Sequence, residues 1–369
     1  MTSVEQVVRE GLEKKLFPGC QLAILGKGAL SQRLCLGKLG YEGHGGPWGE
    51  VGPSTVYDLA SLTKPLVGSL LAGWCLESGA LALGTSLAGL FPRLRGAPAG
   101  SVTVGELLSH SSGYPEYRRV YERRFGACGL YSRADLLDDT LSTDLESRPG
   151  EKARYSDIGF IVLTAVLEKA LGMRVDEAFA KHVSGPLGLS RTFFLPIQGG
   201  ATRPPVSKSQ IAPTSTCPWR GRLIHAEVED ENCWALDGVA VHAGLFSSIE
   251  DLEKLFLHLR SVAAGKAGVL QPQTLRMLWS KQAAPAGTTW ALGWDTPNPM
   301  GSSVPSSAGE KFSRNAVGHL GFTGTSLWFD RDRDLSVIFL SNRVHPTRET
   351  ADLKAFRPAL HDAAVGDLK

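Results

Sequence analysis

The segments of this chain that favour β-strands lie near its two ends, whereas segments that favour helices fill the stretch between them. Near the N-terminus, residues 20–25 and 31–36 flank a Gly-Lys-Gly turn, which predicts a hairpin. Near the C-terminus, residues 325–329 and 335–340 flank a turn of aspartates and arginines, which predicts a second hairpin. We therefore expect one antiparallel sheet that takes its strands from both termini.

Helical periodicity accounts for most of the remaining chain. Residues 3–16 carry an amphipathic stripe that ends at Pro18-Gly19, and residues 350–364 predict a final helix. Further helices are predicted at 62–76, 103–109, 133–141, 156–171, 175–183, 249–264 and 271–280. Two segments rich in Pro, Ser, Thr and Gly are predicted as long surface loops, at 195–221 and 296–315.

These elements predict an α+β fold, in which helices flank the antiparallel sheet and a mostly helical region is inserted into it. A chain of 369 residues can hold one large domain with an insertion or two modest domains. We expect a single domain over residues 1–369. Residues 1–60 and 240–369 would form its α/β subdomain, and residues 61–239 a mainly helical subdomain with loops.

Charge and hydropathy exclude several classes of protein. The formal net charge is +2, so the chain lacks the strong positive charge with which nucleic-acid-binding proteins attract phosphates. The first 17 residues mix charges with apolar residues, which is not typical of a signal peptide. No apolar run approaches the roughly 18 residues of a membrane-spanning helix. We expect a cytoplasmic protein without a membrane partner, unless a signal peptide has been removed.

The cysteines agree with a reducing compartment. None of them forms a C-x-x-C pair or has zinc-ligand spacing with histidine, so free thiols are expected. The six cysteines are Cys20, Cys35, Cys75, Cys128, Cys217 and Cys233.

Ser61 and Lys64 form a Ser-x-x-Lys pair at the start of a predicted helix. Positions three apart share a helix face, so the hydroxyl and the amine can meet. A free serine hydroxyl is a weak nucleophile at neutral pH and needs such a base. A helix N-terminus also offers N–H groups and a positive dipole to a developing oxyanion. By itself the spacing is more typical of a serine helix cap followed by a solvated lysine.

Two later motifs can contribute to the same chemistry. Tyr155 stands in a loop before an apolar helix, and a neighbouring lysine ammonium would lower its pKa and make it a proton shuttle. The alternative is a loop aromatic followed by a helix cap. His319 lies in a glycine-rich approach to a strand, where glycines often mark contact of the backbone with a ligand. This histidine could orient a substrate carboxylate or assist proton transfer, or it could be structural, in a turn before an edge strand.

In order and spacing, Ser61-x-x-Lys64, Tyr155-Ser156-Asp157 and His319-Leu320-Gly321 resemble the class C β-lactamase and DD-peptidase family, which also contains esterases and D-aminopeptidases. Other stretches resemble the family as well, so the likeness covers nearly the whole chain. These stretches are LASLTKP at 59–65, TVGELLSHSSG at 103–113, GPLGL at 185–189 and GLFSS at 244–248.

The resemblance implies a role for each motif. Ser61 would be the acylated nucleophile, and Lys64 and Tyr155 would share the base and acid work. The N–H groups of Ser61 and Phe322 would form the oxyanion hole. His319 would stand where many relatives have lysine. Asp157, Leu320 and Gly321 would line the substrate-binding part of the site, and the reaction would need no metal and no cofactor.

Two departures from the family pattern bear on the substrate. Asp157 stands where β-lactamases have asparagine, and an ionised carboxylate cannot donate a hydrogen bond to a substrate carbonyl. Asp157 could instead pair with Lys64 and hold it protonated, which would favour Tyr155 as the base. Leu320 replaces a threonine whose hydroxyl would contact a substrate carboxylate. With His319, these changes argue against an efficient β-lactamase.

We therefore expect a serine hydrolase that acts through an acyl-enzyme on a small ester, amide or peptide. The alternatives are a D-amino-acid peptidase or carboxypeptidase on cell-wall fragments, weak β-lactamase activity, and a non-catalytic penicillin-binding or scaffold protein. The natural substrate and the oligomeric state stay open.

The stretch from His225 to His242 is dense in acidic residues and histidines. A metal site is one interpretation, although no tight ligand spacing supports it. The preferred interpretation is a loop near the cleft in which Asp230 and His242 support the catalytic residues.

Overall fold

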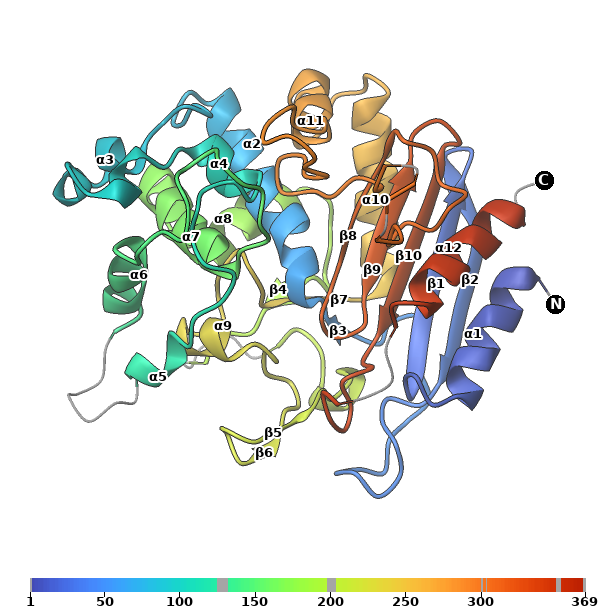
Figure 1. The fold of residues 1–369 in the computed structure, drawn as a ribbon. Coiled ribbons are helices and arrows are strands. Elements are labelled where there is room, and N and C mark those ends of the chain that lie inside the picture. The colour runs from blue at the N-terminus through green and yellow to red at the C-terminus, as the bar shows by residue number, and fades with distance from the viewer. Residues whose placement is uncertain are drawn as a thin grey trace.

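The computed structural model describes residues 2–124, 132–197, 204–299, 301–302, 304–349 and 353–367. Its centre is a five-stranded antiparallel sheet with the order β2-β1-β10-β9-β8 (Figure 1). The strands are β1 (Gly19–Gly26), β2 (Ala29–Gly37), β8 (Ala316–Leu320), β9 (Ser326–Asp330) and β10 (Leu335–Ser341). The two hairpins join where β1 pairs with β10, from Cys20 opposite Ser341 to Gly26 opposite Leu335. The expected sheet from both termini is confirmed.

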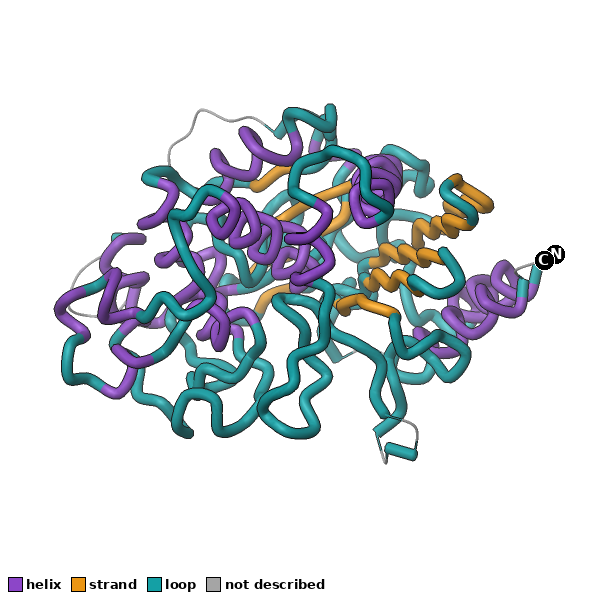
Figure 2. The backbone as a smooth tube through the Cα atoms, turned by 90° about the horizontal axis from the view of Figure 1, so that it is seen from above, coloured by secondary structure: helices purple, strands orange, loops and turns teal. Residues whose placement is uncertain are grey.

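Side chains of β1 alternate between two apolar layers, as a strand buried on both faces requires. Cys20, Leu22 and Ile24 enter the smaller core, which the terminal helices α1 (Ser3–Glu13) and α12 (Phe356–Gly366) complete. Ala23 and Leu25 enter the larger core on the opposite face. Helix α10 (Ile249–Ala263) packs on that face against β1 and β10 (Figures 1 and 2).

The helical part of the molecule surrounds α7 (Asp157–Leu171), whose residues from Ile158 to Leu167 are all buried. Ser156 caps this helix by accepting the Gly159 N–H, and Gly172 ends it with a φ of 66°. The helices that pack against it are α2 (Leu70–Glu77), α3 (Leu87–Leu90), α4 (Val104–Leu108), α6 (Arg133–Leu141) and α8 (Val175–Phe179). Helix α5 (Tyr121–Arg124) packs against α9 (Glu231–Ala235), and α11 (Pro272–Leu278) packs against α10 and α2.

Short strands and irregular turns connect the five-stranded sheet with the helical part of the molecule. β7 (Leu245–Ser247) pairs with β3 (Tyr57–Asp58) and with β4 (Phe193–Phe194). β5 (Thr216–Cys217) pairs with β6 (Arg222–Leu223). The short helical turns are η1 (Ala60–Leu62), η2 (Lys64–Ser69), η3 (Pro92–Leu94), η4 (Pro98–Ser101), η5 (Ala180–Ser184) and η6 (Lys208–Gln210).

Most predicted elements agree with the structure to within a few residues, but four expectations need correction. The helix expected at 62–76 is divided among η1, η2 and α2. The helix expected at 175–183 changes from α8 to the wider turn η5. The helix expected from 350 begins at Phe356, and residues 350–352 lie outside the described residues. Strand β8 was not predicted, because its centre is the glycine Gly318. The proposed division into two subdomains remains a prediction.

Two smaller expectations concern loops and membranes. The segment 195–221 is irregular where it is described but contains η6 and β5, and its residues 198–203 lie outside the description. None of the described helices combines the length and the apolar character needed to cross a membrane.

Gly318 gives the first test, because β8 approaches β9 too closely for a side chain. A Cβ at this position would lie 2.3 Å from Trp328 and 2.4 Å from the Leu327 carbonyl oxygen. We expect Gly318→Ala to lower the free energy of unfolding in urea by about 1–3 kcal/mol. Gly84→Ala is the matched control, since a Cβ there meets nothing within 4 Å and should change stability by less than about 0.5 kcal/mol. Equal stabilities for the two variants would contradict the packing argument.

Candidate active site

Ser61 lies in η1, directly after a residue with unusual backbone geometry. Ala60 has a φ of 48°, in the left-handed region that residues with a Cβ rarely adopt. The Asp58 carboxylate holds this turn by accepting the Ala60 N–H at 2.8 Å, and its other oxygen accepts the Glu229 N–H at 2.7 Å. Such local strain persists only where the surroundings fix it, and it is frequent at active sites. The Ser61 side chain is thus presented on a short, tightly held turn.

Lys64 is fully buried and its ammonium donates to three oxygen atoms. Its Nζ lies 3.0 Å from Ser61 Oγ, 2.6 Å from Asp157 Oδ1 and 2.9 Å from the His242 carbonyl oxygen. An ammonium has three N–H donors, so these partners satisfy it completely. Burial by itself would lower the pKa of Lys64, but Asp157 and Tyr155 outweigh burial and raise it. The expected pairing of Asp157 with Lys64 is therefore present.

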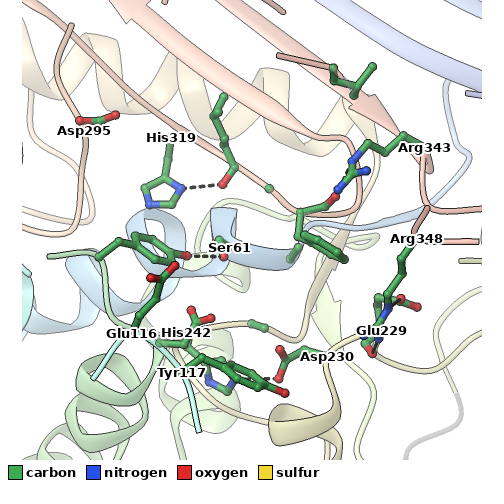
Figure 3. A pocket seen from close by; sticks show the side chains of 18 of the residues that line it. Ser61, Glu116, Tyr117, Glu229, Asp230, His242, Asp295, His319, Arg343 and Arg348 are labelled. Carbon is green, nitrogen blue, oxygen red and sulfur yellow. Dashed lines mark hydrogen bonds and ion pairs between the residues drawn. The ribbon is translucent and has the colours of Figure 1, made fainter. Parts of the chain in front are cut away.

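Tyr155 completes the group, with its hydroxyl 2.7 Å from Ser61 Oγ (Figure 3). Its ring faces Lys64, whose Nζ lies 4.8 Å from the ring centroid. The pKa of Tyr155 does not fall as expected. Burial and the Asp157 carboxylate raise it to about 12, because together they outweigh the attraction of the Lys64 ammonium. At neutral pH the phenol keeps its proton.

His110 belongs to the HSSG stretch and supports Tyr155. Its ring lies 4.8 Å from the Tyr155 ring, and its Nδ1 accepts the Ser156 N–H at 3.0 Å. Trp290, from a loop after α11, packs against both rings. The motif pointed to His110 without giving it a role, whereas no sequence signal pointed to Trp290.

His319 lies at the end of β8, where its Nδ1 is 2.7 Å from the Leu320 carbonyl oxygen. A carbonyl can only accept, so Nδ1 carries the proton of this hydrogen bond. Burial, aided by the Lys64 charge, lowers the pKa of His319 to about 3. The ring is therefore neutral, and its Nε2 has no proton to donate. This disagrees with the expectation that His319 orients a substrate carboxylate.

The turn after β8 lies against the segment that leads to Ser61. Thr323 and Thr325 donate to the carbonyl oxygens of Asp58 and Leu59 at 2.7 Å and 3.0 Å. A Cβ on Gly321 would lie 2.5 Å from the Leu59 carbonyl oxygen, so this position needs glycine. Phe322 follows in this turn, and its ring is half exposed.

These residues line one cavity of about 800 Å³, in which the predicted Ser61, Tyr155, Asp157, His319, Leu320, Gly321 and Phe322 come together. Lys64 lies behind Ser61, out of contact with solvent. Sequence reasoning missed the charged and aromatic residues that form the rest of the wall, because loops and segments distant in sequence supply them. They include Glu116, Tyr117, Trp290, Asp295, Arg343 and Arg348. Glu229 and Glu231 also line the cavity and belong to the acidic segment that was expected near the cleft.

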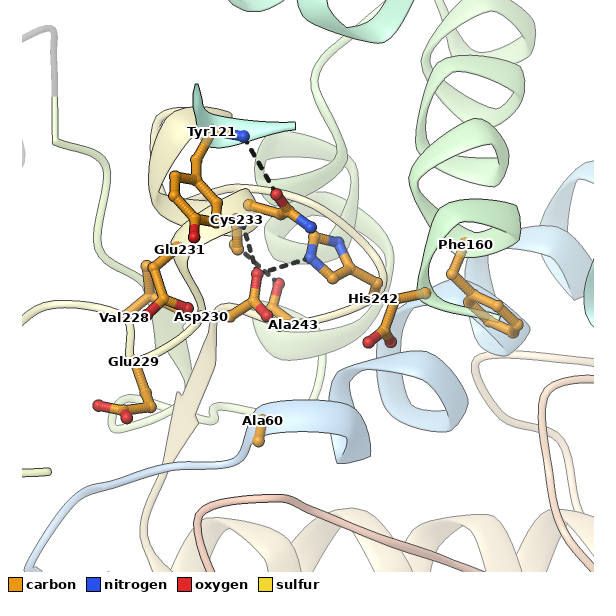
Figure 4. A network of polar contacts seen from close by, with 12 residues as sticks. Ala60, Tyr121, Phe160, Val228, Glu229, Asp230, Glu231, Cys233, His242 and Ala243 are labelled. Carbon is orange, nitrogen blue, oxygen red and sulfur yellow. Dashed lines mark hydrogen bonds and ion pairs between the residues drawn. The ribbon is translucent and has the colours of Figure 1, made fainter. Parts of the chain in front are cut away.

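The acidic segment before β7 also reaches the cavity, as expected. His242 Nε2 lies 2.9 Å from Asp230 Oδ1 (Figure 4). The His242 carbonyl oxygen accepts from Lys64. His225, at the start of this segment, packs instead against Trp48. Within the described parts of the chain, no three histidine, cysteine or acidic side chains gather in a way that could hold a metal ion.

The buried ion pair predicts how activity depends on pH. If the Lys64–Tyr155 pair must lose a proton to act as base, the Asp157 charge opposes that loss, and the rate rises only at alkaline pH. Asp157→Asn removes this charge, so the rise in kcat/KM for p-nitrophenyl acetate should move lower by between about one and three pH units. A pH–rate profile of each variant measures it. Asp144→Asn, at an exposed site, should leave the profile in place, and an unmoved profile in D157N would contradict the role of Asp157.

Comparison with known proteins agrees with this geometry. The Beta-lactamase family model matches residues 4–360. A Salmonella paratyphi A protein named "Putative D-alanyl-D-alanine carboxypeptidase" is 26% identical over 311 residues, which cover 79% of this chain and 70% of that protein.

Two solved structures share the fold. One is a β-lactamase/D-alanine carboxypeptidase from Pseudomonas syringae, with a TM-score of 0.75, 19% identity, and coverage of 100% of this chain and 98% of that one. The other is EstCE1, described as a hydrolase with promiscuous acyltransferase activity, with a TM-score of 0.73, 22% identity and coverage of 98% and 97%. The resemblance inferred from the motifs is confirmed: the chain belongs to the Beta-lactamase family of serine hydrolases.

Proposed function

We propose that this hydrolase cleaves small esters or amides through an acyl-enzyme on Ser61. The observation that carries the proposal is the position of Ser61 Oγ, 3.0 Å from Lys64 Nζ and 2.7 Å from the Tyr155 hydroxyl at the wall of the cavity. A nucleophile within hydrogen-bond reach of a base, which a third group orients, is the arrangement that covalent catalysis needs. Here Asp157 and His242 orient Lys64.

The reaction would proceed in two steps. In the fraction of molecules in which Tyr155 has lost its proton to solvent, a fraction that grows at alkaline pH, Ser61 Oγ attacks the substrate carbonyl carbon and transfers its proton to the Tyr155 oxygen, whose charge the Lys64 ammonium stabilises. The bond to the leaving alcohol or amine then breaks, and Tyr155 returns the proton to that leaving group. Water repeats the sequence on the acyl-enzyme and releases the acid, so protons balance over the cycle.

The oxyanion hole is proposed at the N–H groups of Ser61 and Phe322. The supporting observation is that the 321–325 turn is fastened to Asp58 and Leu59 by two threonine hydroxyls. Backbone donors that are fixed in this way need no rearrangement when charge develops on the substrate oxygen, and this lowers the barrier.

A cytoplasmic location is proposed from the cysteines. Five of them, Cys20, Cys35, Cys75, Cys217 and Cys233, are free thiols, as a reducing compartment favours. The sixth, Cys128, lies outside the described residues.

The nucleophile is tested with Ser61→Ala. We expect this variant to lose turnover of p-nitrophenyl acetate, by a factor of about 10³ or more, because no other group replaces the attacking oxygen. Its circular dichroism spectrum should match that of the parent protein, whereas its free energy of unfolding should fall somewhat, because Lys64 loses one acceptor. Ser101→Ala, at an exposed serine outside the cavity, should keep full activity. Unchanged turnover in S61A would refute the assignment.

A second candidate is a D-amino-acid peptidase or carboxypeptidase, which the name of the Salmonella relative favours. Screening short-chain esters, D-alanyl peptides and the chromogenic cephalosporin nitrocefin separates these activities. Because Asp157 and Leu320 depart from the β-lactamase pattern, we expect ester turnover to exceed nitrocefin turnover.

A non-catalytic penicillin-binding protein would give a different result. It would form a stoichiometric adduct between Ser61 and the fluorescent penicillin Bocillin, without turnover of any ester or peptide. We expect measurable ester turnover instead. The adduct is detected by mass spectrometry of the intact protein, with S61A as the control.

A further inference from the structure

Glu116 stands out among the charged residues of the cavity because its carboxylate has no partner. The side chain is exposed at the cavity wall, and it forms no hydrogen bond or ion pair with any residue that the structure describes. Its backbone is nevertheless fixed, since its carbonyl oxygen accepts the Asp157 N–H at 2.9 Å. Figure 3 shows the Glu116 carboxylate on the same side of the cavity as the Tyr155–Ser61 pair.

The other acidic side chains of the cavity are already occupied. Each accepts from a cation, a histidine or a backbone N–H, so a cationic ligand would have to share the carboxylate with an existing donor. The pairs are Asp157 with Lys64, Asp230 with His242, Glu229 and Glu231 with Arg348, and Asp295 with the Thr296 N–H.

His319 offers a second acceptor in the same cavity. The ring is 4% exposed, and its Nε2 has no hydrogen-bond partner among the described residues. Because Nδ1 is committed to the Leu320 carbonyl, Nε2 presents a lone pair. Leu320 contributes no hydroxyl beside it. A substrate carboxylate at this wall would meet acceptors, whereas a substrate N–H would find a partner.

The balance of charge points the same way. Six acidic residues line the cavity against four basic ones, and the Lys64 ammonium behind Ser61 adds a fifth positive charge, so a small excess of negative charge remains. The basic residues lie at one end, where Arg343 donates to the Phe322 carbonyl and Arg357 to the Gly321 carbonyl. A cavity lined with an excess of one charge attracts ligands of the opposite charge.

We propose that the cavity selects small esters and amides that carry a protonated amine, and that the Glu116 carboxylate binds this amine close to Ser61. The inference rests on the proposed function of Ser61 and adds the substrate class. Amino-acid esters and amides with a free amine belong to this class, and so do esters of cationic amino alcohols.

The experiment compares matched substrates with and without a protonated amine. Alanine p-nitroanilide, in both enantiomers, is paired with its N-acetyl derivative, which places the amine on the acyl side. 2-(Dimethylamino)ethyl acetate, which is protonated at neutral pH, is paired with its uncharged carbon isostere, 3-methylbutyl acetate, and this pair places the cation on the leaving group. The measured quantity is the ratio of kcat/KM for the charged and the neutral member of each pair.

We expect the unmodified enzyme to prefer the charged member of at least one pair, and Glu116→Gln to reduce that preference about tenfold. Glu122→Gln is the matched control, because it removes the same charge from an exposed residue outside the cavity, and it should keep the original ratio. A dependence of the ratio on salt in the parent enzyme that disappears in E116Q would support the ionic contact.

Failure of this inference and failure of the proposed function look different. If the parent enzyme hydrolyses p-nitrophenyl acetate through Ser61 but shows no preference for charge, or if E116Q keeps the parent ratio, the inference about the amine is wrong and the nucleophile stands. If S61A hydrolyses p-nitrophenyl acetate as fast as the parent, both are wrong.

Discussion

A fully buried ammonium must find three acceptors, and this requirement organises the active site. Lys64 finds them on Ser61, on Asp157 at the start of α7 and on the carbonyl of His242 before β7. An unpaired buried charge is strongly destabilising, so the three segments cannot separate without a large cost in free energy. The same contacts that stabilise Lys64 also fix the distance between the serine and the tyrosine. Stability and catalytic geometry thus depend on one set of hydrogen bonds.

Much of the fold could be predicted from periodicity. The hairpins and the helices α6, α7 and α10 have long, regular patterns whose apolar residues are buried. Two features had no such signal. Strand β8 is short and has glycine at its centre, and its register is set by Trp328 and by pairing with Asp295. The division of the helix predicted at 62–76 depends on contacts of Lys64 with segments that are distant in sequence. Local helix propensity does not reflect such contacts.

The motifs predicted which residues meet, but not their electrostatics. Sequence spacing placed Ser61, Lys64, Tyr155 and His319 in one site, and the structure brings them to one cavity. The pKa of Tyr155 was misjudged because burial and Asp157 act on it more strongly than Lys64 does. Likewise, a donor role for His319 toward a substrate carboxylate required a proton on Nε2, whereas the ring keeps its proton on Nδ1, where it is donated to the Leu320 carbonyl. The pKa of a side chain and the position of its proton depend on neighbouring atoms that no motif identifies.

The pairing of β1 with β10 has a consequence for how the chain becomes folded. These neighbours at the middle of the sheet are separated by about three hundred residues of sequence. Contacts between distant segments form slowly, because the entropy of closing the intervening loop must be lost first. During synthesis on a ribosome, the apolar face of the first hairpin stays without its partner strand until β10 has emerged. We therefore expect the N-terminal hairpin to stay exposed to non-native contacts while translation continues, until β10 can cover its apolar face.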